Sequence, residues 1–188
     1  GESSQMEFDP RCYNWNYIGE DTTLWISKNN GSSYSAVHHF NDKVTSVEVA
    51  WSNPDVIYVA TWESWWGDKK IWKTNDKGQT WTNITPTNIN GQDFIPYDIS
   101  ISSYDENILW IARCHMYGKY TDANGDGIAD ILGSEVFKSI NGGLNWTNLS
   151  TPTLGGHKPT NIEHQRGSNG GVYLGTRDAV YYRNNTMV

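Results

Sequence analysis

The sequence has few of the features that mark membrane, nucleic-acid-binding or disulfide-rich proteins. Its 188 residues contain no run of 18 apolar residues, so we expect no membrane insertion. Fourteen basic residues are scattered among 21 acidic ones, and the net charge of −7 argues against a nucleic-acid partner. No basic start is followed by an apolar stretch, which predicts no signal peptide within these residues.

Aromatic residues are abundant, and of the three kinds only Phe is rare. The chain has 10 Trp and 11 Tyr against 4 Phe. Trp and Tyr combine an apolar ring with a polar atom, so this bias suits half-buried strands or rings offered to a polar ligand. The high aromatic content also argues against disorder, despite many Asn, Gly and Ser residues.

A short motif recurs three times, at residues 27–34, 74–81 and 139–146. Each copy reads hydroxyl, x, Asp or Asn, x, Gly, x, small polar, aromatic. The residues at the hydroxyl, Asx, Gly and aromatic positions are Ser27, Asn29, Gly31, Tyr34, Thr74, Asp76, Gly78, Trp81, Ser139, Asn141, Gly143 and Trp146. The steps between copies are about 47 and 65 residues, which indicates an internal repeat.

The residue types of the motif predict a tight turn between two strands. The Asx side chain can accept hydrogen bonds from backbone N–H groups two residues onward. The glycine supplies a positive φ, and the aromatic residue then enters the next strand and packs inward. A short strand with alternating apolar residues precedes each copy, so each unit is expected to be a β-hairpin.

Each hairpin is preceded by two more short strands, and no helical periodicity is present. Repeats of about 45 residues with four antiparallel strands are typical of β-propeller blades, so the predicted fold class is all-β. We expect one segment over residues 1–188. Its blades are about 7–42, 43–90, 94–152 and an incomplete 159–188, with an insertion at 115–132 in the third.

The motif resembles the Asp-box, or BNR repeat, of sialidases, sortilin-like receptors, xyloglucanases and secreted bacterial surface proteins. The resemblance covers nearly the whole chain and implies a propeller with the box between the third and fourth strands of each blade. It says almost nothing about activity. Asn29 and Asn141 stand where the family has Asp, and Tyr34 stands where it has Trp, which weakens the turn rather than the assignment.

Three full blades and part of a fourth cannot close a ring of six to eight. The interpretation we favour is a partial propeller that belongs to a larger protein. Open blades leave unpaired strand edges, so the remaining blades of a parent propeller or a second copy of the chain are the expected structural partners. Cys12 and Cys114 fall in different blades, and two buried thiols are preferred over a disulfide, which stays possible.

The long insertion contains a candidate calcium loop. Its oxygen ligands would be the side chains of Asp122, Asn124, Asp126 and Asp130 and the backbone carbonyl of Ile128. Side-chain oxygens at positions 1, 3, 5 and 9 with Gly at 6 match the start of a calcium loop, although position 12 is Gly133 rather than Glu. We expect a structural Ca²⁺ here; the alternative is a solvated acidic loop.

Two long connections are expected on the propeller face opposite the boxes, and both carry aromatic residues. The candidate ligand-binding residues are Trp62, Trp65, Trp66, Tyr117 and Tyr120. Their rings could stack on sugar rings, or they could pack beneath their own loops. A glycan or a protein is therefore the expected ligand class.

No catalytic residue is assigned. The five arginines do not form the arginine triad of sialidases, and the paired carboxylates that other glycosidases need cannot be picked out among surface acids. We expect a non-catalytic binding or scaffolding module of a secreted or cell-surface protein. The alternative is part of a glycoside hydrolase, sialidase-like or xyloglucanase-like, whose catalytic residues lie partly elsewhere.

Overall fold

The structure, a computed structural model, describes residues 3–62, 69–86, 95–114, 134–151, 154 and 159–186. These residues form fifteen strands and no α-helix. The strands are β1 (Ser3–Asp9), β2 (Cys12–Glu20), β3 (Thr23–Ser27), β4 (Ser35–His39), β5 (Val44–Val49), β6 (Ile57–Thr61), β7 (Lys70–Thr74), β8 (Thr82–Asn83), β9 (Ile95–Ile101), β10 (Leu109–Cys114), β11 (Ser134–Ser139), β12 (Thr147–Asn148), β13 (Pro159–His164), β14 (Val172–Thr176) and β15 (Val180–Arg183).

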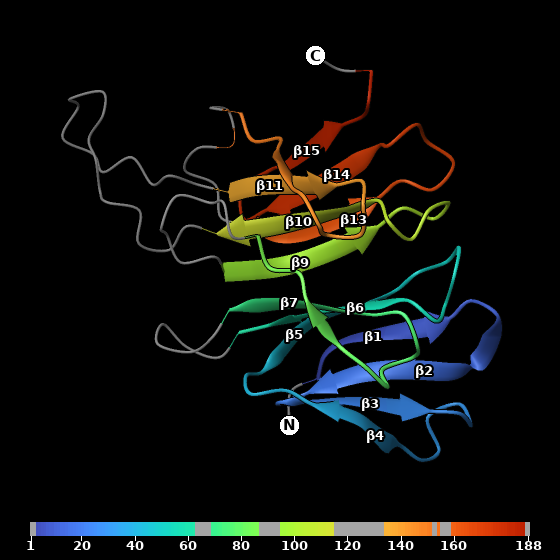
Figure 1. Ribbon diagram of the computed structural model, residues 1–188. Coiled ribbons are helices and arrows are strands. Elements are labelled where there is room, and N and C mark those ends of the chain that lie inside the picture. The colour runs from blue at the N-terminus through green and yellow to red at the C-terminus, as the bar shows by residue number, and fades with distance from the viewer. Residues whose placement is uncertain are drawn as a thin grey trace.

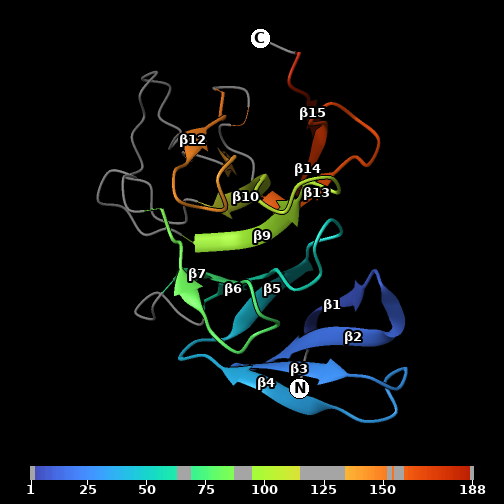
Figure 2. The same ribbon diagram turned by 45° about the vertical axis from the view of Figure 1, so that its right-hand side comes forward.

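The strands form four antiparallel sheets in chain order. Three are four-stranded meanders, β1–β4, β5–β8 and β9–β12, and the last is β13–β15. The sheets follow one another from the N-terminal end to the C-terminal end of the molecule (Figures 1 and 2). The first strands of successive sheets, β1, β5, β9 and β13, lie next to each other. This is the arrangement of propeller blades around an axis, which confirms the predicted all-β partial propeller.

The alternation of side chains between the two faces of each strand explains why the sheets stack face to face. In β5, Val47 and Val49 face the first blade, where they pack with Tyr17 and Leu24. Ser46, which directly precedes Val47, points to the third blade and donates to the Asp98 carboxylate of β9 at 2.9 Å. Because successive side chains of a strand point to opposite faces, one strand serves two interfaces.

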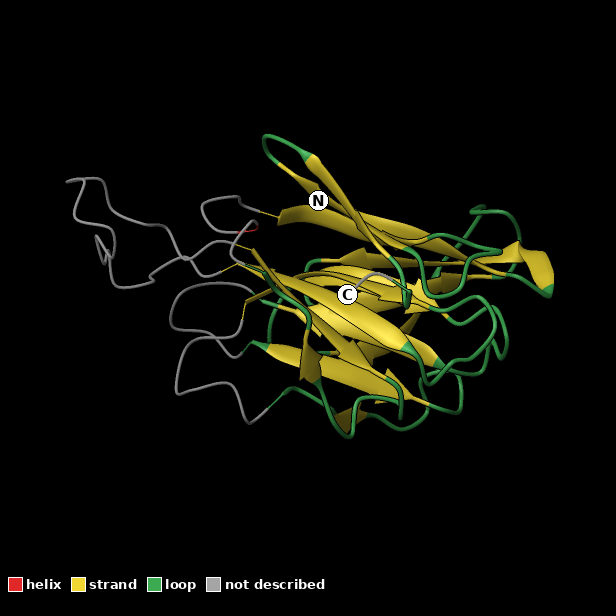
Figure 3. Cartoon of the chain, turned by 90° about the horizontal axis from the view of Figure 1, so that it is seen from above, coloured by secondary structure: helices red, strands yellow, loops and turns green. Residues whose placement is uncertain are grey.

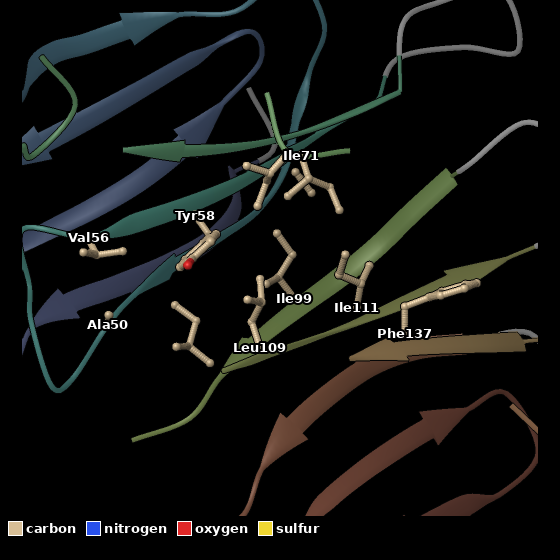
Figure 4. Close-up of a cluster of buried hydrophobic side chains, with 11 residues drawn as sticks. Ala50, Val56, Tyr58, Ile71, Ile99, Leu109, Ile111 and Phe137 are labelled. Atoms are coloured by element: carbon tan, nitrogen blue, oxygen red, sulfur yellow. The ribbon is translucent and has the colours of Figure 1, made fainter. Parts of the chain in front are cut away.

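Hydrophobic cores lie between the blades rather than within one sheet. Figure 4 shows the core between the second and third blades, where side chains from the two sheets face each other. Its buried members include Ala50, Val56, Tyr58 and Ile71 from one side and Ile99, Leu109, Ile111 and Phe137 from the other. Strands and the loops between them make up nearly all of the described chain when it is seen from above (Figure 3).

The three repeated motifs form equivalent turns, placed between β3 and β4, β7 and β8, and β11 and β12. In the second turn, Thr74 Oγ1 donates to Asp76 Oδ1 at 2.6 Å and accepts the N–H of Gly78 at 2.9 Å. Asp76 Oδ1 also accepts the N–H of Thr80 at 2.9 Å. The same bonds are formed by Ser27, Asn29, Gly31 and Ser33 in the first turn and by Ser139, Asn141, Gly143 and Asn145 in the third.

One detail of the sequence prediction was wrong. The Asx side chain accepts the backbone N–H four residues onward, as Asp76 does from Thr80, rather than two. The reason is that two consecutive residues have positive φ, for example Lys77 at 58° and Gly78 at 89°. Two positive φ values tighten the hairpin in the manner of a type I′ turn, which brings the later N–H back to the Asx side chain.

The glycine of the third turn also serves an inter-blade contact. Gly143 has φ 90°, and a Cβ added there would lie 2.9 Å from the Cβ of Ile84 in the second blade. Gly143→Ala should therefore combine left-handed strain with a clash against a buried side chain. We expect a loss of roughly 2–4 kcal/mol in the free energy of unfolding, measured by urea titration.

Gly31→Ala is the matched control, because its backbone is similarly strained at φ 79° while its added Cβ would meet only the Tyr34 hydroxyl at 3.3 Å. It should cost about 1–2 kcal/mol. Equal losses for the two variants would show that the contact with Ile84 contributes nothing.

Candidate functional site

The first strands of the blades are joined by polar side chains, each of which accepts a backbone N–H of the next blade. Gln5 Oε1 of β1 accepts the N–H of Val47 at 3.0 Å, and Ser46 Oγ of β5 accepts that of Ile99 at 3.3 Å. Asp98 of β9 continues the series by accepting the N–H of Ile162 at 2.9 Å. The edges of these strands therefore carry inter-blade hydrogen bonds.

Asp98 is the centre of this series. It is 4% exposed. Its Oδ1 accepts hydrogen bonds from Gln5 Nε2 and Ser46 Oγ, each at 2.9 Å, while Oδ2 accepts the Ile162 N–H. One carboxylate thus connects all four blades. Burial raises its pKa, and the hydrogen bonds that it accepts oppose that rise.

A second set of polar side chains lies further along the same strands, and it consists of Glu7, Glu48, Ser100 and Glu163. Ser100 Oγ accepts the N–H of His164 at 2.8 Å, and the Glu48 carboxylate accepts the N–H of Ile101. Glu163 belongs to the last blade and is exposed. This second set therefore contains three carboxyl groups, one each on β1, β5 and β13.

These carboxyl groups raise each other's pKa. Burial, followed by the charge of Glu163, raises the pKa of Glu7 to about 7, and the charge of Arg166 lowers it. Burial is also the first cause of the raised pKa of Glu48, with the charge of Glu7 next. Glu163 keeps contact with solvent, but partial desolvation by its neighbours is still the first cause of its raised pKa, with the charge of Asp98 next. Raised carboxyl pKa values mark candidate proton donors, although structural clusters show them as well.

Of the predicted ligand-binding aromatics, only Trp62 lies within the described residues. It follows β6, is partly buried, and lies 6.4 Å from the Tyr97 ring of β9, measured between ring centroids. The pair joins the second and third blades on the side opposite the polar turns. Trp65, Trp66, Tyr117 and Tyr120 lie outside the described residues, so the aromatic surface stays a prediction beyond this pair.

The predicted calcium ligands Asp122, Asn124, Asp126, Ile128 and Asp130 also lie outside the described residues. Within the described ranges, no cluster of three or more His, Cys, Asp or Glu side chains could hold a metal ion. Cys12 carries a free, partly exposed thiol, and the side chain of Cys114 is not described. No helix in the described part of the chain is long and apolar enough to cross a membrane.

The sequence alone did not identify Asp98 as a structural centre. It also did not identify Glu7, Glu48 and Glu163 as a group. A signal was present: polar residues alternate with Val or Ile along β5, β9 and β13, where a buried first strand would be apolar on both faces. The pattern shows that these positions are special, but not which N–H group each one meets.

Comparisons with known proteins agree on the architecture. No family model matches the sequence. Over 51 residues the chain is 37% identical to the xyloglucanase Xgh74A of Acetivibrio thermocellus, a match that covers 27% of this chain and 6% of that protein. The match is too short to assign the chain to a family.

Solved structures resemble nearly the whole chain. A GH74 enzyme of Niastella koreensis matches 94% of it with a TM-score of 0.71 at 22% identity. The GH74 xyloglucanase from Xanthomonas campestris matches 98% with a TM-score of 0.73 at 14% identity. A chain of a nidogen–laminin complex matches 98% with a TM-score of 0.64 at 10% identity.

The chain spans 28% of the length of each of the two GH74 proteins. At these identities the likeness concerns the fold alone. The chain is thus a partial β-propeller of four consecutive blades, similar in architecture to portions of xyloglucanase propellers.

Proposed function

We propose that the chain is a glycan-binding portion of a larger, exported β-propeller protein, directed at xyloglucan or a related polysaccharide. The observation that carries this proposal is the similarity to xyloglucanases in both comparisons: 37% identity over 51 residues with one, and a shared fold over 98% of the chain with another. The proposed binding surface includes Trp62 and Tyr97, whose rings lie on adjacent blades opposite the polar turns.

Binding is preferred to cleavage because the carboxylates of Asp98 and Glu48 are engaged in the fold. Asp98 accepts from Gln5, Ser46 and Ile162, and Glu48 accepts from Ile101. A carboxylate whose lone pairs are occupied by such donors cannot easily approach a glycosidic oxygen.

The test is titration of the chain with xyloglucan oligosaccharides, followed by calorimetry. Trp62→Ala should weaken binding about 10-fold or more, because large aromatic anchors dominate such sites. The matched control is Trp51→Ala. Trp51 is 40% exposed in the turn after β5, on the opposite side of the blades, where Arg166 lies over its ring. Absence of binding, or equal loss in both variants, would contradict the proposal.

Glycoside hydrolysis is the second candidate. It is favoured by Glu7, whose pKa of about 7 suits a general acid, and by the nearby carboxyl of Glu163. Release of reducing ends from the same oligosaccharides, lost in Glu7→Gln and Glu163→Gln, would replace the binding proposal with this one.

Three finer assignments belong to the proposal. We assign the repeated turns to the Asp-box class because of the hydrogen bonds that Asp76 accepts from Thr74 and Thr80 in the second turn. We place the protein outside the cell or on its surface, where a polysaccharide such as xyloglucan would be met. Residues 122–130 are assigned to a structural Ca²⁺ site; calcium titration should then give saturable heat that Asp126→Ala abolishes, and no heat would refute the assignment.

A further inference from the structure

Three turns lie side by side at the end of the blades that carries the repeated motifs. They join the first and second strands of the second, third and fourth blades, at residues 50–56, 102–108 and 165–171. Backbone hydrogen bonds tie two of them to the repeated turns: the N–H of Lys77 donates to the carbonyl of Asp55, and that of Gly142 to the carbonyl of Asn107, each at 2.9 Å. The three turns are therefore on the side opposite the proposed glycan surface.

Side chains also connect the three turns to one another. Ser52 Oγ of the second blade donates to Glu106 Oε2 of the third at 2.8 Å. The N–H of Ser103 in the third blade donates to Nδ1 of His164, the last residue of β13 in the fourth, at 3.4 Å. A surface that is held by such bonds before a ligand arrives loses little freedom on binding.

Arg166 of the fourth blade lies over the ring of Trp51 of the second. Its guanidinium carbon is 3.6 Å from the ring centroid. The side chain therefore reaches back across the third blade, away from the open edge of the fourth. Both residues contact solvent, Trp51 with 40% of its surface exposed. Stacking on an aromatic ring engages the flat face of a guanidinium and leaves the N–H groups at its edge for other partners.

No carboxylate within the described ranges forms an ion pair with Arg166. None lies within 4 Å of its guanidinium nitrogens. Asp55 of the neighbouring turn is already paired with Arg11, whose Nη2 lies 2.5 Å from Asp55 Oδ1. Desolvation and the charge of Asp98 raise the pKa of Glu163, and the charge of Arg166 only opposes that rise. Arg166 is thus an exposed cation held in place by a ring, with its donors available.

Tyr104 extends the surface on the side of the third blade. Its side chain is 65% exposed, and its ring stands edge-on to that of His164 at 6.5 Å between centroids. A Cβ added to Gly167 would lie 3.8 Å from the Tyr104 hydroxyl, so this ring is next to the residue that follows Arg166. Turns usually consist of Gly, Pro, Asn, Asp and Ser, whereas Trp, Tyr and Arg are enriched at the energetic centres of protein interfaces.

We propose that Trp51, Tyr104 and Arg166 form a docking site for an acidic segment of a partner protein. An Asp or Glu carboxylate of the segment accepts hydrogen bonds from the guanidinium edge that Trp51 holds in place, and an adjacent apolar side chain packs on the Tyr104 ring. Charge complementarity argues for this occupant, because pairs of arginine and carboxylate are frequently bidentate and stronger than neutral hydrogen bonds.

The site does not depend on the parts of the propeller beyond this chain. It is formed by turns of three neighbouring blades that bond to one another, and neither open edge of the sheet series contributes to it. It is also separate from the proposed glycan surface, so failure of either proposal leaves the other unaffected.

The probe is a phage-displayed library of random short peptides, selected on the immobilised 188-residue chain. The most enriched peptide is then synthesised and titrated into the chain by calorimetry. We expect enriched peptides to carry Asp or Glu next to an apolar residue and to bind saturably. Selection of no peptide, or of peptides without acidic residues, would overturn the proposal.

Variants of the protein locate the binding. Arg166→Gln should weaken binding of the selected peptide about 10-fold or more, and Arg166→Lys, which keeps the charge but not the planar fork, should weaken it less. The matched control is Arg177→Gln, which removes an exposed arginine between β14 and β15 at the opposite end of the blades and should leave binding unchanged. Equal effects of Arg166→Gln and Arg177→Gln would show that only net charge matters and would overturn the proposal.

Tyr104→Ala tests the apolar half of the site and should also weaken peptide binding about 10-fold. The altered side chains are exposed, so all variants should fold, which urea unfolding checks. Unchanged binding in Tyr104→Ala would remove this ring from the site and refute the proposed surface. Polygalacturonate that binds more tightly than any selected peptide, with the same dependence on Arg166, would overturn the proposal in favour of an acidic polysaccharide.

Discussion

Replacing Asp98 with alanine should lower the free energy of unfolding by about 3–5 kcal/mol, which is enough to unfold much of a marginally stable chain. The change removes the acceptor for the Gln5 amide, the Ser46 hydroxyl and the Ile162 N–H at once. A donor left buried without a partner costs about 1–3 kcal/mol. Urea unfolding followed by tryptophan fluorescence measures the loss.

Two further variants separate the carboxylate from its volume. Asp98→Asn keeps the size and one acceptor oxygen but turns an NH₂ group toward a donor, so its loss should be intermediate. Glu20→Ala removes an exposed carboxylate at the end of β2 and should change stability by less than about 0.5 kcal/mol. A loss for Asp98→Ala no larger than that of Glu20→Ala would show that the inter-blade bonds contribute nothing net.

The fold was predictable because its signals are local. Thr74, Asp76 and Gly78 lie within five positions and bond to one another, so their residue types alone predict a hairpin. The alternation of Val47 and Val49 with polar neighbours likewise predicts a strand. Such patterns repeat along the chain, and repetition by itself indicates blades.

The site was less predictable because its contacts join distant residues. Asp98 was one acidic residue among many in the sequence, and nothing local shows that its carboxylate meets both Gln5 and Ile162. The charge of Glu163 acts on Glu7 from the opposite end of the chain.

The carboxyl groups of the first strands should make the chain more stable at mildly acidic than at alkaline pH. Folding raises the pKa of Glu7 from 4.5 to about 7, first by burial and then by the charge of Glu163. Between these values the folded chain binds a proton that the unfolded chain releases. The free energy of unfolding therefore falls as pH rises from about 4.5 to about 7 and is level above that.

His38 and His164 affect stability in the opposite direction, because burial lowers the pKa of each and they therefore favour unfolding on acidification. A comparison of Glu7→Gln with the natural chain removes their effect, since both proteins contain these histidines. The shift of Glu7 corresponds to at most roughly 3 kcal/mol, and its partial exposure should reduce this to about 1–2 kcal/mol. Urea unfolding at pH 5 and pH 8 should show Glu7→Gln gaining that amount over the natural chain at pH 8 only, with Glu20→Gln as the exposed control. A pH difference unchanged by Glu7→Gln would mean that Glu7 is ionised in the folded chain, because only a proton taken up on folding can produce the slope.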